Sequence, residues 1–279
     1  MAARTVVITG GTSGIGEVAA VELARQGARI VLIARDPERA GMTLSKLRNA
    51  NPGAQHTSHL ADLSRISEMR RTAKEIAQSE PEIDVLINNA GALFNTRKVT
   101  EDGLEMTFAT NHMAYFVVTN LLLPNLKPGA RIVSTASDAH KGAKLDFDDL
   151  QSAKKYSGFS VYGKSKLANI LFNRELARRI DGTGVTANCL HPGFVATRFG
   201  DQSGGILSVA VKIAKPIGAI SPQEGAKTVV YLASSPEVEG QSGGYYYKNR
   251  LATPTKEAQN DADAKQLREI SAKLAGMAV

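Results

Sequence analysis

The stretch TVVITGGTSGIG, residues 5–16, places a short apolar run directly before a turn that is rich in glycine. The run is typical of a buried β-strand, and the residues after Gly16 have the i, i+3, i+4 apolar spacing of a helix. Glycine allows a tight turn and close approach of a ligand, and a helix that begins there offers free N–H groups to a pyrophosphate. A glycine pattern alone could be a simple turn. Between a strand and a helix, it predicts a dinucleotide-binding site.

Apolar strands and amphipathic helices alternate along the rest of the chain. The apolar runs predict strands at 5–9, 29–34, 55–60, 84–89, 130–136, 185–190 and 244–249. Strands of this kind, each followed by a helix, indicate a parallel sheet that is covered on both faces. The predicted fold class is α/β: a single-domain doubly wound parallel sheet of the Rossmann type over residues 1–279, with about seven strands. Its ligand crevice should lie beyond the carboxyl ends of the strands.

The composition argues against several classes of protein. The chain has 279 residues, 43% of them hydrophobic, which is enough for a large core. The single cysteine, Cys189, argues against a disulfide framework, fits a reducing cytosol and is expected to be a buried, inert strand residue. The histidines show no metal-ligand spacing, so no metal site is predicted. No apolar run approaches the roughly 20 residues that span a bilayer, and a strand follows the first residues directly, so we expect a cytoplasmic protein without a membrane segment.

The formal net charge of +7 could indicate a nucleic-acid partner. However, the basic residues are scattered among acidic ones, without a dense basic stretch that is interleaved with aromatic residues. A basic protein attracts phosphorylated small molecules through the same long-range field. We therefore predict a small anionic ligand and no nucleic-acid partner.

Three motifs in order resemble those of the short-chain dehydrogenase/reductase family: T-G-x-x-x-G-I-G at 9–16, NNAG at 88–91 and YGKSK at 162–166. The resemblance covers about residues 4–250. NHMAYFVVTNLLLP, VYGKSKLANILFNRELARR and LHPGFVAT look more narrowly like the retinol-dehydrogenase-like branch, whose closing helix is similar to 256–276 here. The membrane anchor of several animal members has no counterpart in this sequence. The resemblance implies an oxidoreductase that acts on CH–OH/C=O groups with NAD(P).

Helical spacing selects one of two lysines in the third motif. Residues i and i+4 share a helix face, so Tyr162 and Lys166 are neighbours, whereas Lys164 points elsewhere. The resemblance implies that Tyr162 is the general acid/base and that Lys166 holds the nicotinamide ribose and lowers the pKa of the phenol. Lowering a phenol pKa from ~10 to ~7 requires about 4 kcal/mol. One ammonium ~4 Å away supplies about that much at an effective dielectric constant near 20.

Two further catalytic residues are implied by the resemblance. Ser137, at the carboxyl end of a strand, hydrogen-bonds the substrate oxygen, and Ser134 remains a weaker competitor for this role. Asn111 holds a water that links Lys166 to solvent, although an ordinary helix asparagine is the alternative. Residues 138–158 form an insertion before the catalytic helix that the retinol-like branch also shows.

The residues after the second strand predict the cofactor. An NAD-preferring site usually carries an acid there, but this chain has Ala34 followed by Arg35, and a guanidinium can hold the 2′-phosphate of NADP(H). Asp36 keeps NAD(H) possible, and Arg39 could help to bind the phosphate. Together with the family's motifs, this gives the cofactor-binding set Gly10, Thr12, Ser13, Gly14, Ile15, Gly16, Arg35, Asp62, Leu63, Asn89, Ala90, Gly91, Tyr162, Lys166, Pro192, Gly193, Val195 and Thr197.

Some of these positions have second interpretations. Asp62, which by resemblance contacts the adenine, is with Ser64 also a candidate N-cap for the helix after the third strand. Asn88 is expected to support the adenosine ribose and to brace the sheet. Val195 and Thr197 are expected to hold the carboxamide. His191 is interpreted as structural.

The segment 194–220 is bounded by glycine and apolar in its middle, as expected of a substrate lid. It favours a hydrophobic aldehyde, ketone or alcohol, although core packing or a subunit contact would give the same pattern. The helix at 221–234 and the one that carries Tyr162 often form subunit contacts in relatives, so monomer and homo-oligomer (dimer or tetramer) both remain open. A non-catalytic dinucleotide sensor or scaffold on the same fold is the alternative function.

Overall fold

The computed structural model describes residues 4–194 and 220–278. Its strands form one sheet in the order β3-β2-β1-β4-β5-β6-β7-β8. They are β1 Thr5–Thr9, β2 Arg29–Ala34, β3 Thr57–Leu60, β4 Ile83–Asn88, β5 Leu126–Thr135, β6 Thr186–Leu190, β7 Tyr245–Tyr247 and β8 Arg250–Leu251. β1 to β7 pair in parallel, and β8 is antiparallel to β7. The predicted α/β doubly wound sheet is confirmed.

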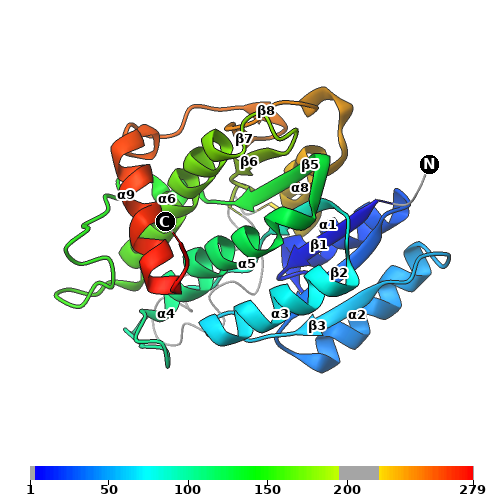
Figure 1. Ribbon diagram of the computed structural model, residues 1–279, viewed down its shortest axis with the longest axis horizontal. Coiled ribbons are helices and arrows are strands. Elements are labelled where there is room, and N and C mark those ends of the chain that lie inside the picture. Colours follow the sequence, from blue (N-terminus) through cyan, green and yellow to red (C-terminus); the bar gives the residue numbers. More distant parts are fainter. Residues whose placement is uncertain (1–3, 195–219, 279) are drawn as a thin grey trace.

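Helices cover both faces of this sheet (Figure 1). On one face lie α3 Ile66–Ser79, α5 Ala114–Leu122 and α6 Gly158–Arg179, and α9 Asp261–Ala275 packs against α6. On the other lie α1 Gly14–Arg25, α2 Pro37–Ala50 and α8 Pro222–Ser234. Successive side chains of a strand point to opposite faces, so Val7 belongs to the first core and Val6 and Ile8 to the second.

The strand order reverses direction at β1, which pairs with β2 on one side and with β4 on the other. In a doubly wound sheet, the ligand crevice lies at such a switch point, outside the carboxyl ends of the strands. The glycine turn follows β1, and NNAG begins at the last residue of β4. The fold therefore brings these two motifs to the same place.

The last predicted strand, 244–249, is two strands in the structure. Lys248 and Asn249 have φ values of 48° and 61°, so both lie in the left-handed region. Two successive residues of this kind form the tight turn that joins antiparallel strands. The chain therefore reverses after β7 and forms β8, which makes eight strands rather than about seven.

The predicted N-cap of the helix after β3 is wrong. The helix α3 begins at Ile66, after both Asp62 and Ser64, and Arg65 occupies the cap position without a capping side-chain bond. Asp62 Oδ1 accepts hydrogen bonds from Ser64 N and Oγ, at 3.0 and 2.8 Å. The first amide of α3 donates instead to Asp102 Oδ2 at 2.8 Å, from a loop 36 residues further along.

The C-terminal helix is shorter than predicted. A 3₁₀ turn at Glu257–Gln259 precedes α9, which begins at Asp261 rather than at residue 256. Asn260 caps it by accepting hydrogen bonds from Ala262 N and Asp263 N, and Gly276 ends it in the left-handed conformation. The division of the chain into one domain with an insertion at 138–158 stays a prediction. Of the helices described in residues 4–194 and 220–278, none is long and apolar enough to cross a membrane.

Candidate active site

The glycine turn between β1 and α1 packs tightly against the end of β4. Gly10 and Gly14 have φ values of +67° and +55°, a conformation that favours glycine. A Cβ atom at Gly10 would lie 2.8 Å from Ala90 Cα. A Cβ at Gly16 would collide with Gly10 O and Asn89 Nδ2. The close approach of these backbones therefore requires glycine at both positions.

The start of α1 remains open to a ligand. Thr12, Gly14 and Ile15 are half-buried, and Ser13 is exposed. Ser13 occupies the N-cap position, but its side chain makes no capping hydrogen bond. The first amides of α1 thus keep the donor capacity and positive dipole end that suit a pyrophosphate. The turn fits the dinucleotide that the sequence predicts.

The two asparagines of NNAG point in different directions. Asn88 is fully buried, and its Nδ2 donates to Thr119 Oγ1 of α5 at 2.8 Å, so it braces the sheet rather than lining the glycine turn. Asn89 Nδ2 donates to Gly10 O at 3.2 Å, and its backbone amide donates to Thr9 Oγ1 at 2.9 Å. Asn89 is therefore the residue that ties β4 to the glycine turn.

The residues after β2 leave a basic side chain exposed at the end of the strand. Arg35 is exposed directly beyond the end of the strand. Asp36 caps α2, because its Oδ1 accepts from Arg39 N at 3.1 Å, and its other oxygen lies 3.8 Å from Arg39 Nε. The Asp36 carboxylate, which keeps NAD(H) possible, thus already caps α2. Arg35 makes no ion pair within the described part of the chain.

The adenine-side residues follow β3. Leu63 is 7% exposed and belongs to the core, whereas Asp62 is half-buried and bonded to Ser64. The backbone of Ala61 donates to Ala34 O at 2.8 Å, which holds this loop against the end of β2. Asp62 is therefore placed near the crevice, and its contact with adenine stays a prediction.

Ser137 and Tyr162 meet beyond the end of β5. Ser137 lies close enough to the Tyr162 hydroxyl for its side chain to lower the pKa of the phenol, and Ser137 Oγ accepts a hydrogen bond from Ala139 N at 3.2 Å. Gly163 makes this approach possible, because a Cβ there would lie 2.6 Å from Ala139 O. The glycine of YGKSK thus allows α6 to pack directly on the loop that carries Ser137.

Lys166 lies on the same face of α6 as Tyr162, as its spacing predicts. Its Nζ is 5.6 Å from the Tyr162 ring centroid and 5.8 Å from that of Tyr115. The lysine is 2% exposed, and its ammonium donates to Thr135 O at 2.9 Å. Lys164, two residues earlier, is half-buried and takes no part in this arrangement.

Asn111 lies in a π-helical turn, Ala109–Met113, between α4 (Met106–Phe108) and α5. Such turns are frequent at functional sites. Its Oδ1 accepts from Ala92 N at 2.8 Å, and its Nδ2 donates to Ala92 O at 2.9 Å and to Ser165 Oγ at 3.0 Å. A Cβ at Gly91 would lie 3.4 Å from both Lys166 Nζ and Asn111 Oδ1, so these residues converge at the end of β4.

The electrostatics differ from the expectation that Lys166 lowers the phenol pKa. Burial raises the pKa of Tyr162 to about 12, and the hydrogen bond with Ser137 acts in the opposite direction. Burial also lowers the pKa of Lys166 from 10.5 to about 7. In the protein alone, desolvation therefore outweighs the attraction between ammonium and phenolate. The phenol is protonated at neutral pH and is ready to donate.

Two supporting residues were not identified from the sequence. Thr135 O receives Lys166 through its backbone, which no side-chain motif could reveal. His140 Nδ1 lies 2.7 Å from Ser137 O, and Thr255 N donates to His140 Nε2 at 3.4 Å. His140 therefore links the Ser137 loop to the C-terminal segment. In the sequence, only its position three residues after Ser137 could have indicated that His140 supports the site.

The structure also locates Ser134, Cys189 and His191. Ser134 is fully buried within β5, paired with Asn88 and Cys189, so it does not compete with Ser137. Cys189 is a free, buried thiol whose pKa is raised by burial, which confirms the prediction of a buried, inert strand residue. His191 is 8% exposed and stacks on Tyr247 with 4.0 Å between ring centroids. This packing supports a structural role.

The motif after β6 is only partly described. Pro192 and Gly193 are half-buried, and Gly193 has a φ of +90°, as expected of a turn. Val195, Thr197 and most of the predicted lid at 194–220 lie outside the described residues. Across the residues that are described, no group of three or more His, Cys, Asp or Glu side chains could hold a metal ion.

Comparison with known proteins agrees with this geometry. A sequence model described as short chain dehydrogenase matches residues 4–204. The Homo sapiens protein named retinol dehydrogenase 14 is 41% identical over 298 residues, which covers 99% of this chain and 88% of the relative.

Solved structures give the same result. A protein from Mycobacterium paratuberculosis is 31% identical, with a TM-score of 0.79 over 98% of this chain and 94% of that chain. A short chain dehydrogenase from Burkholderia cenocepacia J2315, in complex with NADP, is 26% identical, with a TM-score of 0.70 over 87% of this chain and 94% of that chain. The sequence model's range, residues 4–204, includes the glycine turn and α6.

Proposed function

Since the chain belongs to the short-chain dehydrogenase/reductase family and to its retinol-dehydrogenase-like branch, we propose that it uses NADP(H) to interconvert hydrophobic aldehydes or ketones and their alcohols. Oxidoreductase activity on CH–OH and C=O groups follows from the family itself. The observation that carries the proposal is the position of Tyr162 beside Ser137, with Lys166 on the same helix face and the glycine turn at the same end of the sheet.

Each residue of the catalytic set has its own role in the proposed reaction. A bound nicotinamide supplies the hydride chemistry. Tyr162 donates a proton to the substrate oxygen in reduction and accepts it in oxidation, and Ser137 hydrogen-bonds that oxygen. Lys166 holds the ribose of the cofactor, and its position against Thr135 O sets where that contact can form. Asn111 fixes the Ala92 backbone beside them.

The preference for NADP(H) rests on the end of β2. A free guanidinium at Arg35 can pair with a 2′-phosphate, whereas a ribose hydroxyl would need an acceptor there. The nearest acid, Asp36, already caps α2. The neighbouring structure that contains NADP supports this choice.

The hydrophobic substrate class has two supports. The relative named retinol dehydrogenase 14 takes its name from an apolar alcohol. In this chain, Phe159 and Phe194 are 60% and 54% exposed, close in sequence to Tyr162 and to the turn after β6. Exposed phenylalanines next to a catalytic segment suit an apolar ligand.

A carbonyl panel tests the proposal directly. Loss of NADPH and NADH absorbance is followed with all-trans-retinal, decanal and a hydrophobic ketone, with glyceraldehyde as the polar comparison. We expect turnover of the apolar carbonyls, a lower KM for NADPH than for NADH, and no turnover by Tyr162→Phe.

Two outcomes would argue against the proposal. Better turnover of glyceraldehyde than of any apolar carbonyl would reject the substrate class. Tight NADPH binding without turnover of any carbonyl or alcohol would favour the alternative, a dinucleotide sensor or scaffold on the same fold.

A further inference from the structure

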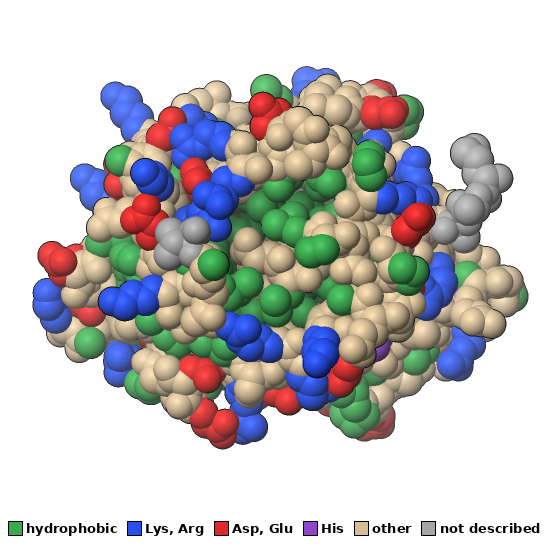
Figure 2. All heavy atoms as spheres, viewed as in Figure 1, with side chains coloured by type: hydrophobic (Ala, Val, Ile, Leu, Met, Phe, Trp, Pro, Cys, Tyr) green, Lys and Arg blue, Asp and Glu red, His purple; other side chains and the backbone are tan. Residues whose placement is uncertain are grey.

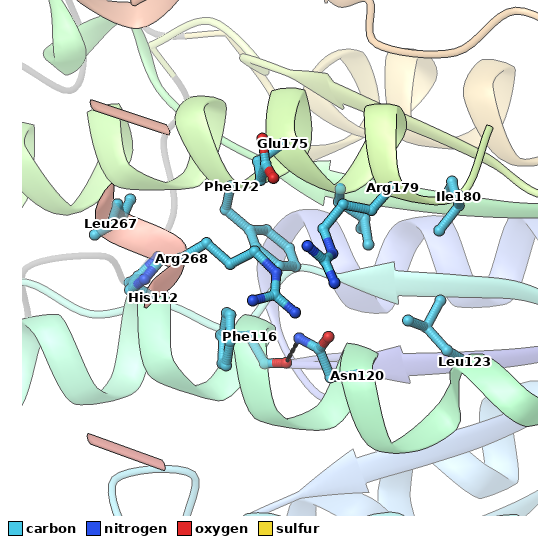
Figure 3. Close-up of a pocket in the computed structure, with 11 residues that line it drawn as sticks. His112, Phe116, Asn120, Leu123, Phe172, Glu175, Arg179, Ile180, Leu267 and Arg268 are labelled. Atoms are coloured by element: carbon cyan, nitrogen blue, oxygen red, sulfur yellow. Dashed lines mark hydrogen bonds between the residues drawn. The ribbon is translucent and has the colours of Figure 1, made fainter. Parts of the chain in front are cut away.

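A cavity of about 220 Å³ lies where α5, α6 and α9 meet. Its apolar walls include Phe116 of α5, Phe172 of α6 and Leu267 of α9. Figure 3 shows these side chains around a common space, and Figure 2 shows a hollow with hydrophobic side chains inside and Lys or Arg at its edge on this face. We call this cavity the α9 pocket.

Two arginines point into the α9 pocket. Arg179 comes from the last turn of α6 and Arg268 from α9, and their guanidinium groups lie toward the same space (Figure 3). Neither forms an ion pair with a carboxylate in residues 4–194 and 220–278. Arg268 Nη1 is buried and has no hydrogen-bond partner there. A buried donor without a partner is costly, and more so when it is charged.

The carboxylates close to the pocket are already engaged. Glu175 also lines the pocket, is 9% exposed and pairs with Arg178 through Oε2. Asp261 pairs with Arg174 and Arg178. Burial lowers the pKa of Arg268, and the positive charge of Arg179 acts in the same direction, whereas the negative charges of Glu175 and Glu269 act in the opposite direction. Because arginine stays protonated in proteins, the two guanidiniums keep their charge and repel each other.

His112, which also lines the pocket, is uncharged and does not change the net charge of the pocket. His112 Nε2 lies 2.8 Å from Ser271 Oγ of α9. Burial lowers the pKa of His112 to about 3, so the ring is neutral at pH 7. The ring packs edge-on against Phe172, with 6.2 Å between centroids, and adds to the apolar wall.

The frame of the pocket holds Arg268 in place. Arg174 and Arg178 of α6 bind Asp261 at the start of α9. At its end, Arg70 of α3 donates to the backbone oxygens of Ala275 and Gly276. With α9 fixed at both ends, the backbone of Arg268 is positioned before any ligand arrives. Preorganised charges of this kind bind at a lower entropic cost.

We propose that the α9 pocket binds a small organic anion, whose carboxylate is held by Arg179 and Arg268 and whose apolar body packs on Phe116 and Phe172. A guanidinium binds a carboxylate through paired N–H donors, and two guanidiniums define one position for it. The cavity is smaller than the roughly 300–1,000 Å³ of pockets for drug-sized ligands, which limits the body to a single ring or a short chain.

This site is separate from the catalytic residues. Tyr162 lies near the start of α6, whereas Glu175 and Arg179 lie in its second half. On α6 the first residue that lines the pocket is Phe172, ten residues after Tyr162, which corresponds to about 15 Å along the axis, and on the neighbouring helix His112 directly follows Asn111. A ligand in the α9 pocket should therefore bind together with NADPH and substrate.

Benzoate is the probe, and benzamide is its neutral match. Binding to the full chain is measured by calorimetry and by ligand-observed NMR, with and without NADPH. We expect saturable benzoate binding that NADPH leaves unchanged, and benzamide binding at least tenfold weaker. Arg268→Gln should lower benzoate affinity at least tenfold. Lys265→Gln, at an exposed position one turn earlier on α9, should change it less than twofold.

Several results would overturn the proposal. Equal affinity for benzoate and benzamide would show that charge is not recognised, and displacement by NADPH or substrate would place benzoate in the active site. If Arg268→Gln does not fold, Arg179→Gln at an exposed position provides the same test. An unchanged affinity there, or a change in sedimentation that shows a second copy covering the pocket, would reject the anion site.

Discussion

Lys166 Nζ donates a hydrogen bond of 2.9 Å to the backbone oxygen of Thr135, the last residue of β5. The same oxygen lies 3.4 Å from Tyr115 Oη and 3.5 Å from Asn169 Nδ2, both donors. The lysine is thus held by the end of the sheet and not by a carboxylate. Its charge is buried without an anionic partner among the described residues, which explains why burial lowers its pKa to about 7.

Lys166→Met should stabilise the cofactor-free protein while abolishing turnover. Burial lowers the pKa of Lys166 from 10.5 to about 7, which corresponds to at most about 5 kcal/mol of unfavourable free energy at neutral pH. Loss of the bond to Thr135 O offsets about 1 kcal/mol. We expect the free energy of unfolding at pH 7 to rise by roughly 3 kcal/mol, measured by urea denaturation.

The pH dependence of this effect has a definite sign. The folded-state pKa is lower than the unfolded one, so the unfolded chain binds the additional proton between pH 7 and 10.5. Wild-type stability therefore rises over that range, and the advantage of Lys166→Met should largely vanish by about pH 10. Lys164→Met is the control, with a change within about 0.5 kcal/mol. A destabilised Lys166→Met at pH 7 would contradict the assignment.

Tyr162→Phe should lose most activity and keep the cofactor. Removing a general acid/base typically costs 10²–10⁴-fold in rate. NADPH binding, followed by fluorescence titration, should change less than about twofold, because one hydroxyl is lost and the fold of α6 is kept. The matched control is Tyr156, which lies just before α6 and whose hydroxyl donates to Phe94 O at 2.9 Å. Tyr156→Phe should stay active. Near-normal turnover by Tyr162→Phe would reject the mechanism.

Ser137→Ala should shift alcohol oxidation to higher pH. Oxidation needs the Tyr162 phenolate, and the Ser137 hydrogen bond lowers a phenol pKa that burial has raised to about 12. Without that bond the pKa rises, so less phenolate is present at any given pH, and the oxidation profile moves upward. Ser134→Ala, inside β5, should leave the profile unchanged. The measurement is kcat/KM for an alcohol with NADP⁺ across alkaline pH, with stability checked at each point.

The strands were predictable because buried parallel strands are continuous apolar runs. The bounds of β1 and β2 agree with the prediction, and those of the inner strands β4 and β6 differ by one residue. The site was predictable wherever one residue type is required by backbone geometry, as at Gly10 and Gly16.

What the sequence did not reveal depends on contacts between distant segments or on solvent exclusion. The cap of α3 comes from Asp102, and Lys166 is held by a backbone oxygen, so neither has a local signature. The direction of the Tyr162 pKa required the burial of the phenol, which spacing cannot give. The prediction that Asn88 braces the sheet is confirmed by its bond to Thr119, whereas its contact with the adenosine ribose stays a prediction.

Arg35→Ala should reduce discrimination between the two cofactors. If Arg35 holds the 2′-phosphate, its removal should raise the KM for NADPH about tenfold to a hundredfold, as expected for a charge-assisted hydrogen bond of about 1.5–3 kcal/mol. The KM for NADH should change little. Arg48→Ala, also exposed and at the far end of α2, is the control. A lower KM for NADH than for NADPH in the wild type, unchanged in Arg35→Ala, would refute the assignment.

Two glycine-to-alanine substitutions should have opposite effects on stability. Gly10→Ala places a side chain at φ +67° and 2.8 Å from Ala90 Cα, so backbone strain of about 1–2 kcal/mol adds to a collision with the segment after β4, and NADPH binding should weaken as well. Gly41 lies inside α2 with nothing within 4 Å of its added Cβ. Gly41→Ala should therefore stabilise the protein by about 0.5–1 kcal/mol through helix propensity and leave NADPH binding unchanged. Thermal unfolding with and without NADPH separates the two cases, and a Gly10→Ala protein that is as stable as the wild type would show that the turn can relax away from Ala90.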